Sequence, residues 1–277
     1  MYPMNNAPIG VFDSGLGGLT AVKELNRILP HENIVYFGDT ARLPYGSRSR
    51  ETILKYAEQD VKFIKQHNVK YIIAACGTVS SAVGQDTHFG GDIPFTGVVL
   101  PAAQAASTAT RTGRIGVIGT SATIKSGAYG RAIRAINPDV SVIGNACPLF
   151  VHLVECGFTA RDNKITRLAA EQYLKPIKDE NVDVLIMGCT HYPVIKDIIA
   201  DYMGSDVTLI SPGEEAAKHV LAALTESESL ADREEAGEIK YYSSDSPEMF
   251  AENAHSFLGG QFGGNVERVS IDELTSL

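Results

Sequence analysis

In Val182-Asp-Val-Leu-Ile-Met-Gly-Cys-Thr-His-Tyr-Pro193, an apolar run ends abruptly in Cys189, Thr190 and His191. A short run of Val, Leu, Ile and Met predicts a buried parallel strand. Open α/β sheets place their ligand sites just beyond the carboxyl ends of such strands, where loops converge. Cys189 is therefore expected where chemistry usually occurs, with simple packing as a small hydrophobe as the alternative.

The same arrangement occurs a second time, around Cys76. The segment 69–75 predicts a strand that ends in Cys76-Gly-Thr78, and a helix is expected to follow. Both places combine an apolar strand, a cysteine and a nearby threonine. Two such sites in two halves of one chain are less easily explained as two buried hydrophobes.

Two polar turns follow the first two predicted strands, 9–12 and 33–37. The first, Asp13–Leu19, is rich in glycine and opens a helix whose unpaired N–H groups suit an anion, although its spacing differs from the dinucleotide fingerprint. Asp13 at the strand end suggests proton handling, with a helix cap as the alternative. In the second, 38–46, Arg42 offers charge to an acidic ligand. Ser47 or Ser49 is expected to cap the next helix.

The remaining pattern indicates two related α/β domains that face each other. Further strands are expected over 97–101, 114–119, 140–143, 207–210, 239–242 and 266–269, with helices over 102–109, 161–180 and 214–224. Ser246 with the proline after it predicts the start of a helix. We expect residues 1–97 with 212–277 to form a discontinuous first domain that carries Cys76, and residues 98–211 to form the second, with Cys189. Each would be a mainly parallel sheet flanked by helices.

Composition is that of a globular protein. The 277 residues are 44% hydrophobic and 21% charged, and no run approaches the roughly 18 apolar residues of a membrane helix. Residues 1–8 lack a basic region followed by an apolar one, so we expect a cytoplasmic protein without a secretory signal. The net charge of −9 argues against a nucleic-acid surface but leaves small anions open.

The four cysteines are too sparse for a disulfide scaffold and contain no CxxC pair, so reduced thiols are expected and no metal site is indicated. Cys147 and Cys156 are expected to pack in the core.

The motifs together resemble the glutamate racemases of the aspartate/glutamate racemase family. The matching stretches span nearly the whole chain: 13–18, 38–46, 118–120 with Thr123, and 188–193. The resemblance implies two pseudosymmetric domains with the active site in the cleft between them, and interconversion of L- and D-glutamate without a cofactor. It also implies a homodimer and a role in supplying D-glutamate for peptidoglycan.

Inverting an α-carbon requires a proton to leave one face and another to arrive at the opposite face, which a thiolate and a thiol on opposite sides can do in either direction. By resemblance, the catalytic residues are Cys76 served by Asp13, and Cys189 served by His191, with Glu155 an additional candidate. The residues expected to hold the substrate are Ser14, Pro44, Tyr45, Gly46, Gly77, Thr78, Thr120, Thr123 and Thr190.

One departure concerns Gly77, where the family commonly has asparagine. Gly77 offers only its backbone there, which leaves a weaker grip on the substrate, a shifted pose or a compensating group open. Alternative functions are racemisation of another acidic amino acid such as aspartate, a non-catalytic amino-acid or anion-binding protein, and a thiol enzyme that uses only Cys189 with His191.

Overall fold

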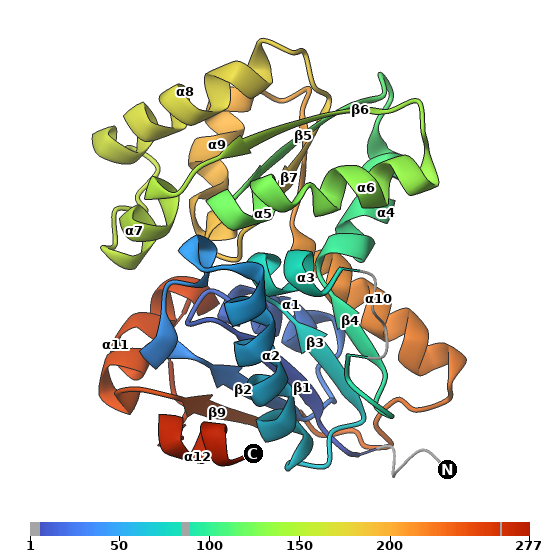
Figure 1. Cartoon of the computed structure of the whole chain (residues 1–277), viewed down its shortest axis with the longest axis vertical. Coiled ribbons are helices and arrows are strands. Elements are labelled where there is room, and N and C mark those ends of the chain that lie inside the picture. Colours follow the sequence, from blue (N-terminus) through green and yellow to red (C-terminus); the bar gives the residue numbers. More distant parts are fainter. Residues whose placement is uncertain (1–5, 85–88, 261) are drawn as a thin grey trace.

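The computed structural model describes residues 6–84, 89–260 and 262–277, and it contains two parallel sheets, one above the other in Figure 1. The six-stranded sheet has the order β10 (Val266–Arg268), β9 (Ile239–Ser243), β2 (Ile34–Gly38), β1 (Ile9–Asp13), β3 (Tyr71–Ala74), β4 (Phe95–Gly97). The four-stranded sheet has the order β6 (Ser141–Ala146), β5 (Arg114–Gly119), β7 (Val184–Met187), β8 (Thr208–Ile210). The predicted α/β class with parallel sheets is confirmed.

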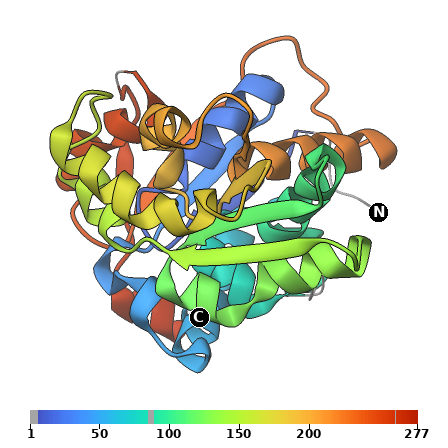
Figure 2. The same ribbon diagram turned by 90° about the horizontal axis from the view of Figure 1, so that it is seen from above.

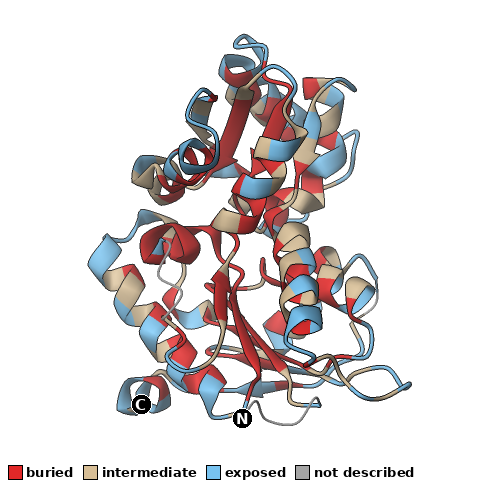
Figure 3. Ribbon diagram, turned by 90° about the vertical axis from the view of Figure 1, so that its right-hand side faces the viewer, coloured by how far each residue is buried: buried red, intermediate tan, exposed pale blue. Residues whose placement is uncertain are grey.

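Helices cover both sheets, and Figure 2 shows the smaller sheet with its helices nearest the viewer. The helices are α1 (Leu19–Ile28), α2 (Arg50–Lys65), α3 (Gly77–Val83), α4 (Val99–Ala109), α5 (Ser121–Ser126), α6 (Ala128–Ile136), α7 (Leu149–Glu155), α8 (Lys164–Lys178), α9 (Lys196–Met203), α10 (Pro212–Glu226), α11 (Pro247–Leu258) and α12 (Ile271–Ser276). Short 3₁₀ turns occupy η1 (Thr40–Arg42), η2 (Tyr45–Ser47) and η3 (Tyr192–Ile195). Buried residues line the strands and the inner faces of the helices (Figure 3).

Two predicted helix starts rest on local side-chain caps. The Ser49 hydroxyl accepts from the Thr52 N–H at 3.2 Å, so Ser49 caps α2. The Ser246 hydroxyl accepts from the Met249 N–H at 3.2 Å at the start of α11. Such caps satisfy N–H groups that the first turn of a helix leaves unpaired, which is why they are readable from sequence.

The strand predicted over 97–101 is wrong. The strand there is β4, which ends at Gly97, and Val99 already begins α4. Pro101 is tolerated in the first turn because its missing N–H would have no partner there. Val98 and Val99 are buried, and a short buried apolar run does not distinguish strand from helix.

The C-terminal segment completes the first sheet. Strand β9 pairs in parallel with β2, with Tyr36 opposite Tyr241, and β10 pairs with β9. The domain boundaries near residues 97 and 211 stay a prediction. None of the helices in the described ranges is long and apolar enough to span a membrane.

Candidate active site

A cavity of about 180 Å³ lies where the two sheets meet, and both cysteine-bearing loops line it. Cys76 follows β3 and precedes α3, and Cys189 follows β7, so each lies beyond the carboxyl end of a strand. The predicted site residues that line this cavity are Ser14, Pro44, Tyr45, Gly46, Cys76, Gly77, Thr78, Thr120, Cys189, Thr190 and His191. The structure therefore brings residues from distant motifs to one place, while their roles stay a prediction.

Strand register places Cys76 beside Ser14. Strands β1 and β3 pair with Phe12 opposite Ala74, so the residues that follow them emerge at the same edge. The Cys76 thiol donates to the Ser14 hydroxyl at 3.6 Å. Burial raises the pKa of the Cys76 thiol to about 12, and the charge of Asp13 raises it further against the opposing hydrogen bonds from Val79 and Ser14. Cys76 therefore rests as a protonated thiol.

Asp13 is fully buried and does not line the cavity. Its Oδ2 accepts from the N–H of Gly18, the residue before α1, at 2.7 Å, and the start of α1 itself has no side-chain cap. Its Oδ1 has no hydrogen-bond partner among the described residues. Asp13 thus combines a structural bond with a spare acceptor near Cys76, and the proton-handling role stays open.

Cys189 lies beside a chain of two polar groups. Its sulfur is 3.8 Å from His191 Nδ1, and His191 Nε2 is 3.1 Å from Glu155 Oε1. Burial lowers the pKa of His191, but the hydrogen bonds with Cys189 and Glu155 outweigh this and raise it to about 10. A protonated imidazole stabilises a thiolate at Cys189. The two cysteines thus differ in their hydrogen-bond partners, a hydroxyl for Cys76 and an imidazole for Cys189.

The glycine-rich turn of the first sheet supports the second cysteine loop by close approach. A Cβ on Gly17 would stand 2.2 Å from Thr190 Oγ1 and 2.7 Å from His191 Nδ1, so only glycine fits there. The Thr20 hydroxyl is shared between Gly17 O at 2.8 Å and Thr190 O at 3.0 Å. The turn that follows β1 therefore packs directly against the Cys189 loop that follows β7.

Gly77 makes a second such contact. A Cβ there would stand 2.3 Å from the carbonyl oxygen of Gly188, the residue before Cys189. The absence of a side chain at position 77 thus allows the two cysteine loops to touch.

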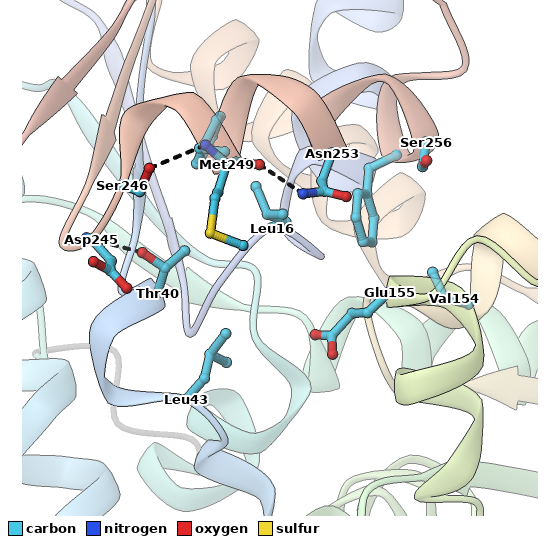
Figure 4. Close-up of a pocket in the computed structure, with 12 residues that line it drawn as sticks. Leu16, Thr40, Leu43, Val154, Glu155, Asp245, Ser246, Met249, Asn253 and Ser256 are labelled. Carbon is cyan, nitrogen blue, oxygen red and sulfur yellow. Dashed lines mark hydrogen bonds between the residues drawn. The ribbon is translucent and has the colours of Figure 1, made fainter.

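Three predicted residues lie outside the lining of this cavity. Besides Asp13, Thr123 is buried behind Thr120, whose hydroxyl donates to the Thr123 hydroxyl at 3.0 Å. Glu155 lines a second cavity of about 280 Å³, between α7 and α11, and its carboxylate projects into that space (Figure 4). Leu43 lines both cavities, so they adjoin.

Arg42 and Cys156 also differ from expectation. Arg42 is buried, with its guanidinium hydrogen-bonded to Asp39 and Asp60, and it does not line the cavity, so it offers no charge to a ligand there. Cys156 is exposed, so its predicted core role is wrong, whereas Cys147 is buried as expected.

Sequence reasoning missed several lining residues. They are Leu43, Ser47, Ser121, Pro148, Val151 and His152. Leu43, Ser47 and Ser121 are close neighbours of quoted motif residues, and that proximity was a usable signal. The other three belong to α7 or its start, which carries no motif, so they became visible only when the fold placed this short helix at the cavity.

Comparison with known proteins gives consistent results. The profile of the Asp/Glu/Hydantoin racemase family matches residues 9–220. A glutamate racemase of Geobacter metallireducens is 44% identical over 95% of this chain and 97% of its own length. The structure of a Francisella tularensis glutamate racemase in complex with D-glutamate superposes with a TM-score of 0.89 at 41% identity, covering 99% of this chain and 100% of the other.

A glutamate racemase isoform from Bacillus anthracis superposes with a TM-score of 0.91 at 37% identity, covering 96% of this chain and 98% of the other. Likeness over nearly the full length, in sequence and in fold, shows that the chain belongs to the Asp/Glu/Hydantoin racemase family.

Proposed function

We propose that this protein interconverts L- and D-glutamate with Cys76 and Cys189 as the two proton-transfer groups. The observation that carries the proposal is that two cysteines, each following a strand of a different sheet, line one cavity, Cys76 beside Ser14 and Cys189 beside His191. The named activity of the relatives, and the D-glutamate bound to one of them, support glutamate as the substrate.

In the proposed reaction, the Cys189 thiolate takes the α-hydrogen as a proton, and the electron pair of that bond stays on Cα. The Cys76 thiol then delivers its own proton to the opposite face. One S–H bond forms and one breaks, so the inverted amino acid leaves with Cys189 as a thiol and Cys76 as a thiolate. The reverse sequence converts the other enantiomer and restores the starting state.

Hydroxyl groups from both sheets support the substrate in this proposal. Thr78 Oγ1 and Thr120 Oγ1 are 3.0 Å apart, and the two residues follow strands of different sheets, β3 and β5. Fixed hydroxyl groups that replace water can bind the carboxylates and stabilise the charge that develops near Cα.

The test is incubation of the reduced protein with L-glutamate in heavy water. We expect D-glutamate to form and the α-hydrogen to exchange. Cys76→Ser and Cys189→Ser should each abolish racemisation, while Cys156→Ser, a change at an exposed thiol, should leave it intact. Binding of glutamate without exchange would instead indicate a binding protein, and activity that survives Cys76→Ser would indicate a single-nucleophile thiol enzyme. Faster turnover of aspartate than of glutamate would reassign the substrate.

We also propose that the protein acts as a cytoplasmic homodimer that supplies D-glutamate for peptidoglycan. The cellular role follows from the proposed substrate, glutamate. Analytical ultracentrifugation tests the dimer, and growth of a depleted strain on added D-glutamate tests the cellular role.

A further inference from the structure

A buried cluster of charges lies behind the loop that carries Pro44, Tyr45 and Gly46. Arg42 Nε donates to Asp39 Oδ2 at 2.5 Å, and Arg42 Nη2 donates to Asp60 Oδ1 at 2.8 Å. Asp60 comes from α2, whereas Asp39 precedes η1 and Arg42 is the last residue of η1. Both carboxylates are fully buried, and Arg42 is 8% exposed.

The guanidinium is also fixed by neighbours on α2. Arg42 Nη1 donates to Gln59 Oε1, and the guanidinium carbon lies 4.3 Å from the centre of the Tyr56 ring. Planar stacking and forked hydrogen bonds leave Arg42 a single orientation. The cluster is therefore a rigid support.

The Tyr45 hydroxyl lies between the two carboxylates. It contacts Asp39 Oδ2 closely and Asp60 Oδ2 at 3.3 Å. A tyrosine hydroxyl carries one hydrogen, and the shorter contact assigns it to Asp39. Asp39 also accepts from the Ser244 hydroxyl at 2.8 Å. The contact between the Tyr45 oxygen and Asp60 therefore lacks a hydrogen unless Asp60 supplies it.

The charges agree with this hydrogen count. Two ionised carboxylates and one guanidinium would leave a net negative charge in a buried place, which is strongly unfavourable. Burial raises the pKa of Asp60 well above its usual range, and the charges of Asp39 and, more weakly, Asp13 add to the effect against Arg42 and the hydrogen bond with Tyr45. A protonated Asp60 leaves a neutral cluster in which every contact has a hydrogen.

The cluster determines what the loop presents to the cavity. Tyr45 is 1% exposed and its hydroxyl is committed to the carboxylates, so the hydroxyl is not offered to a substrate. The next residue, Gly46, packs against the second sheet, since a Cβ there would stand 3.0 Å from Thr120 Cβ. Holding Tyr45 therefore holds Gly46 against Thr120 across the cavity.

We propose that Asp60 is a positioning residue for the loop 43–47: as a neutral acid it donates to Tyr45 and thereby sets the substrate-facing backbone of that loop. Its importance for catalysis rests on the proposed function, whereas its effect on the loop does not. None of the atoms of Asp60 lines the cavity, so it acts through Tyr45.

Two variants test whether Asp60 acts as a neutral acid or as a charged group. Asp60→Asn keeps a neutral hydrogen-bond donor, and Asp60→Ala removes the polar group altogether. In Asp60→Asn, Oδ1 still accepts from Arg42 and the amide donates to the Tyr45 oxygen, so we expect a KM for L- and D-glutamate within about threefold of the wild type. Asp60→Ala removes both contacts. We therefore expect KM to rise about tenfold, with a smaller change in kcat. Glu58→Gln, an acid-to-amide change at an exposed position of α2, is the matched control and should change neither constant.

Amide hydrogen exchange of a peptide covering residues 40–48 supplies a readout that does not depend on activity. Asp60→Ala should lose protection there, and Asp60→Asn should keep it. If the wild type does not racemise glutamate, the proposed function fails while the exchange result still decides the role of Asp60. Should Asp60→Ala not fold, Tyr45→Phe replaces it, with loss of protection and a raised KM expected.

If Asp60→Asn raises KM and lowers amide protection as much as Asp60→Ala does, the neutral-acid assignment is overturned. Unchanged protection and KM in Asp60→Ala, or in Tyr45→Phe where that variant replaces it, would overturn the positioning role.

Discussion

Replacement of Gly77 by alanine should separate the two cysteine loops. The added Cβ would stand 2.3 Å from the Gly188 carbonyl oxygen, whereas ordinary contact begins at 3.4 Å, so one loop must retreat by about 1 Å. The obstacle is backbone rather than the end of a flexible side chain, and Gly188 directly precedes Cys189. A displacement of about 1 Å at a reacting group can lower the rate on the order of a hundredfold.

The assay is racemisation of L-glutamate followed by circular dichroism, together with thermal unfolding. We expect kcat/KM to fall by about two orders of magnitude and stability to fall by about 1 kcal/mol, because overpacking against backbone costs about 1–3 kcal/mol and the higher helix propensity of alanine at the start of α3 offsets only part of that. Gly260→Ala is the control, since a Cβ there meets nothing within 4 Å. Gly77→Asn adds an amide to the same Cβ, so any recovery relative to alanine measures what that amide contributes.

Retention of kcat/KM within about threefold in Gly77→Ala would contradict the predicted displacement, because the contact would then have relaxed without moving Cys189.

Three further changes test the site and its surroundings. Glu155→Gln should lower the pKa of His191 below about 10, because the carboxylate raises it, so kcat/KM should begin its alkaline decline at lower pH; an unmoved decline would contradict this. The raised pKa of His191 also means that its contribution to stability is full below pH 6.5 and is lost as the pH rises through about 10. Ser14→Ala removes a hydrogen bond that lowers the pKa of Cys76, so the pH optimum should move upward and kcat/KM should fall about fivefold, equally for both enantiomers; unequal changes would show an assay error, and no change would exclude the bond from catalysis. Tyr192→Phe should destabilise the fold by about 1 kcal/mol in urea unfolding because its hydroxyl donates to Cys147 O at 2.9 Å, whereas Tyr129→Phe should not, since that buried hydroxyl has no partner among the described residues; the opposite ranking would contradict the assignment.

Local chemistry explains what the sequence alone could predict. Ser49 and Ser246 cap helices through contacts within three residues, so both starts were readable. The apolar runs before Cys76 and Cys189 identified strands, and the general rule for parallel sheets then predicted a site at their carboxyl ends. The motif resemblance added the pairing of the two cysteines, which lie in separate sheets.

Contacts between distant segments explain what could not be predicted. Arg42 looked available to a ligand, but Asp39 pairs with its charge and Asp60, from a different element, holds the guanidinium in the interior. Glu155 is hydrogen-bonded to His191, as its candidate role requires. Its carboxylate also projects into the cavity beside α11, a helix about a hundred residues away in the chain. Val98 and Val99 fit a strand or a helix equally well, and only their packing assigns Val99 to α4.

The pairing of β2 with β9 constrains how this protein can be made. Ile34 lies opposite Ile239, so the ribosome must release most of the chain before this ladder can form. Until then β2, whose five residues are all buried in the finished sheet, is an apolar edge that another nascent chain could join. Phe257, whose ring meets His191 edge-on at 5.3 Å, emerges later still. The surroundings of Cys189 are thus completed only after Phe257 has emerged, following a long interval in which the growing polypeptide is prone to association.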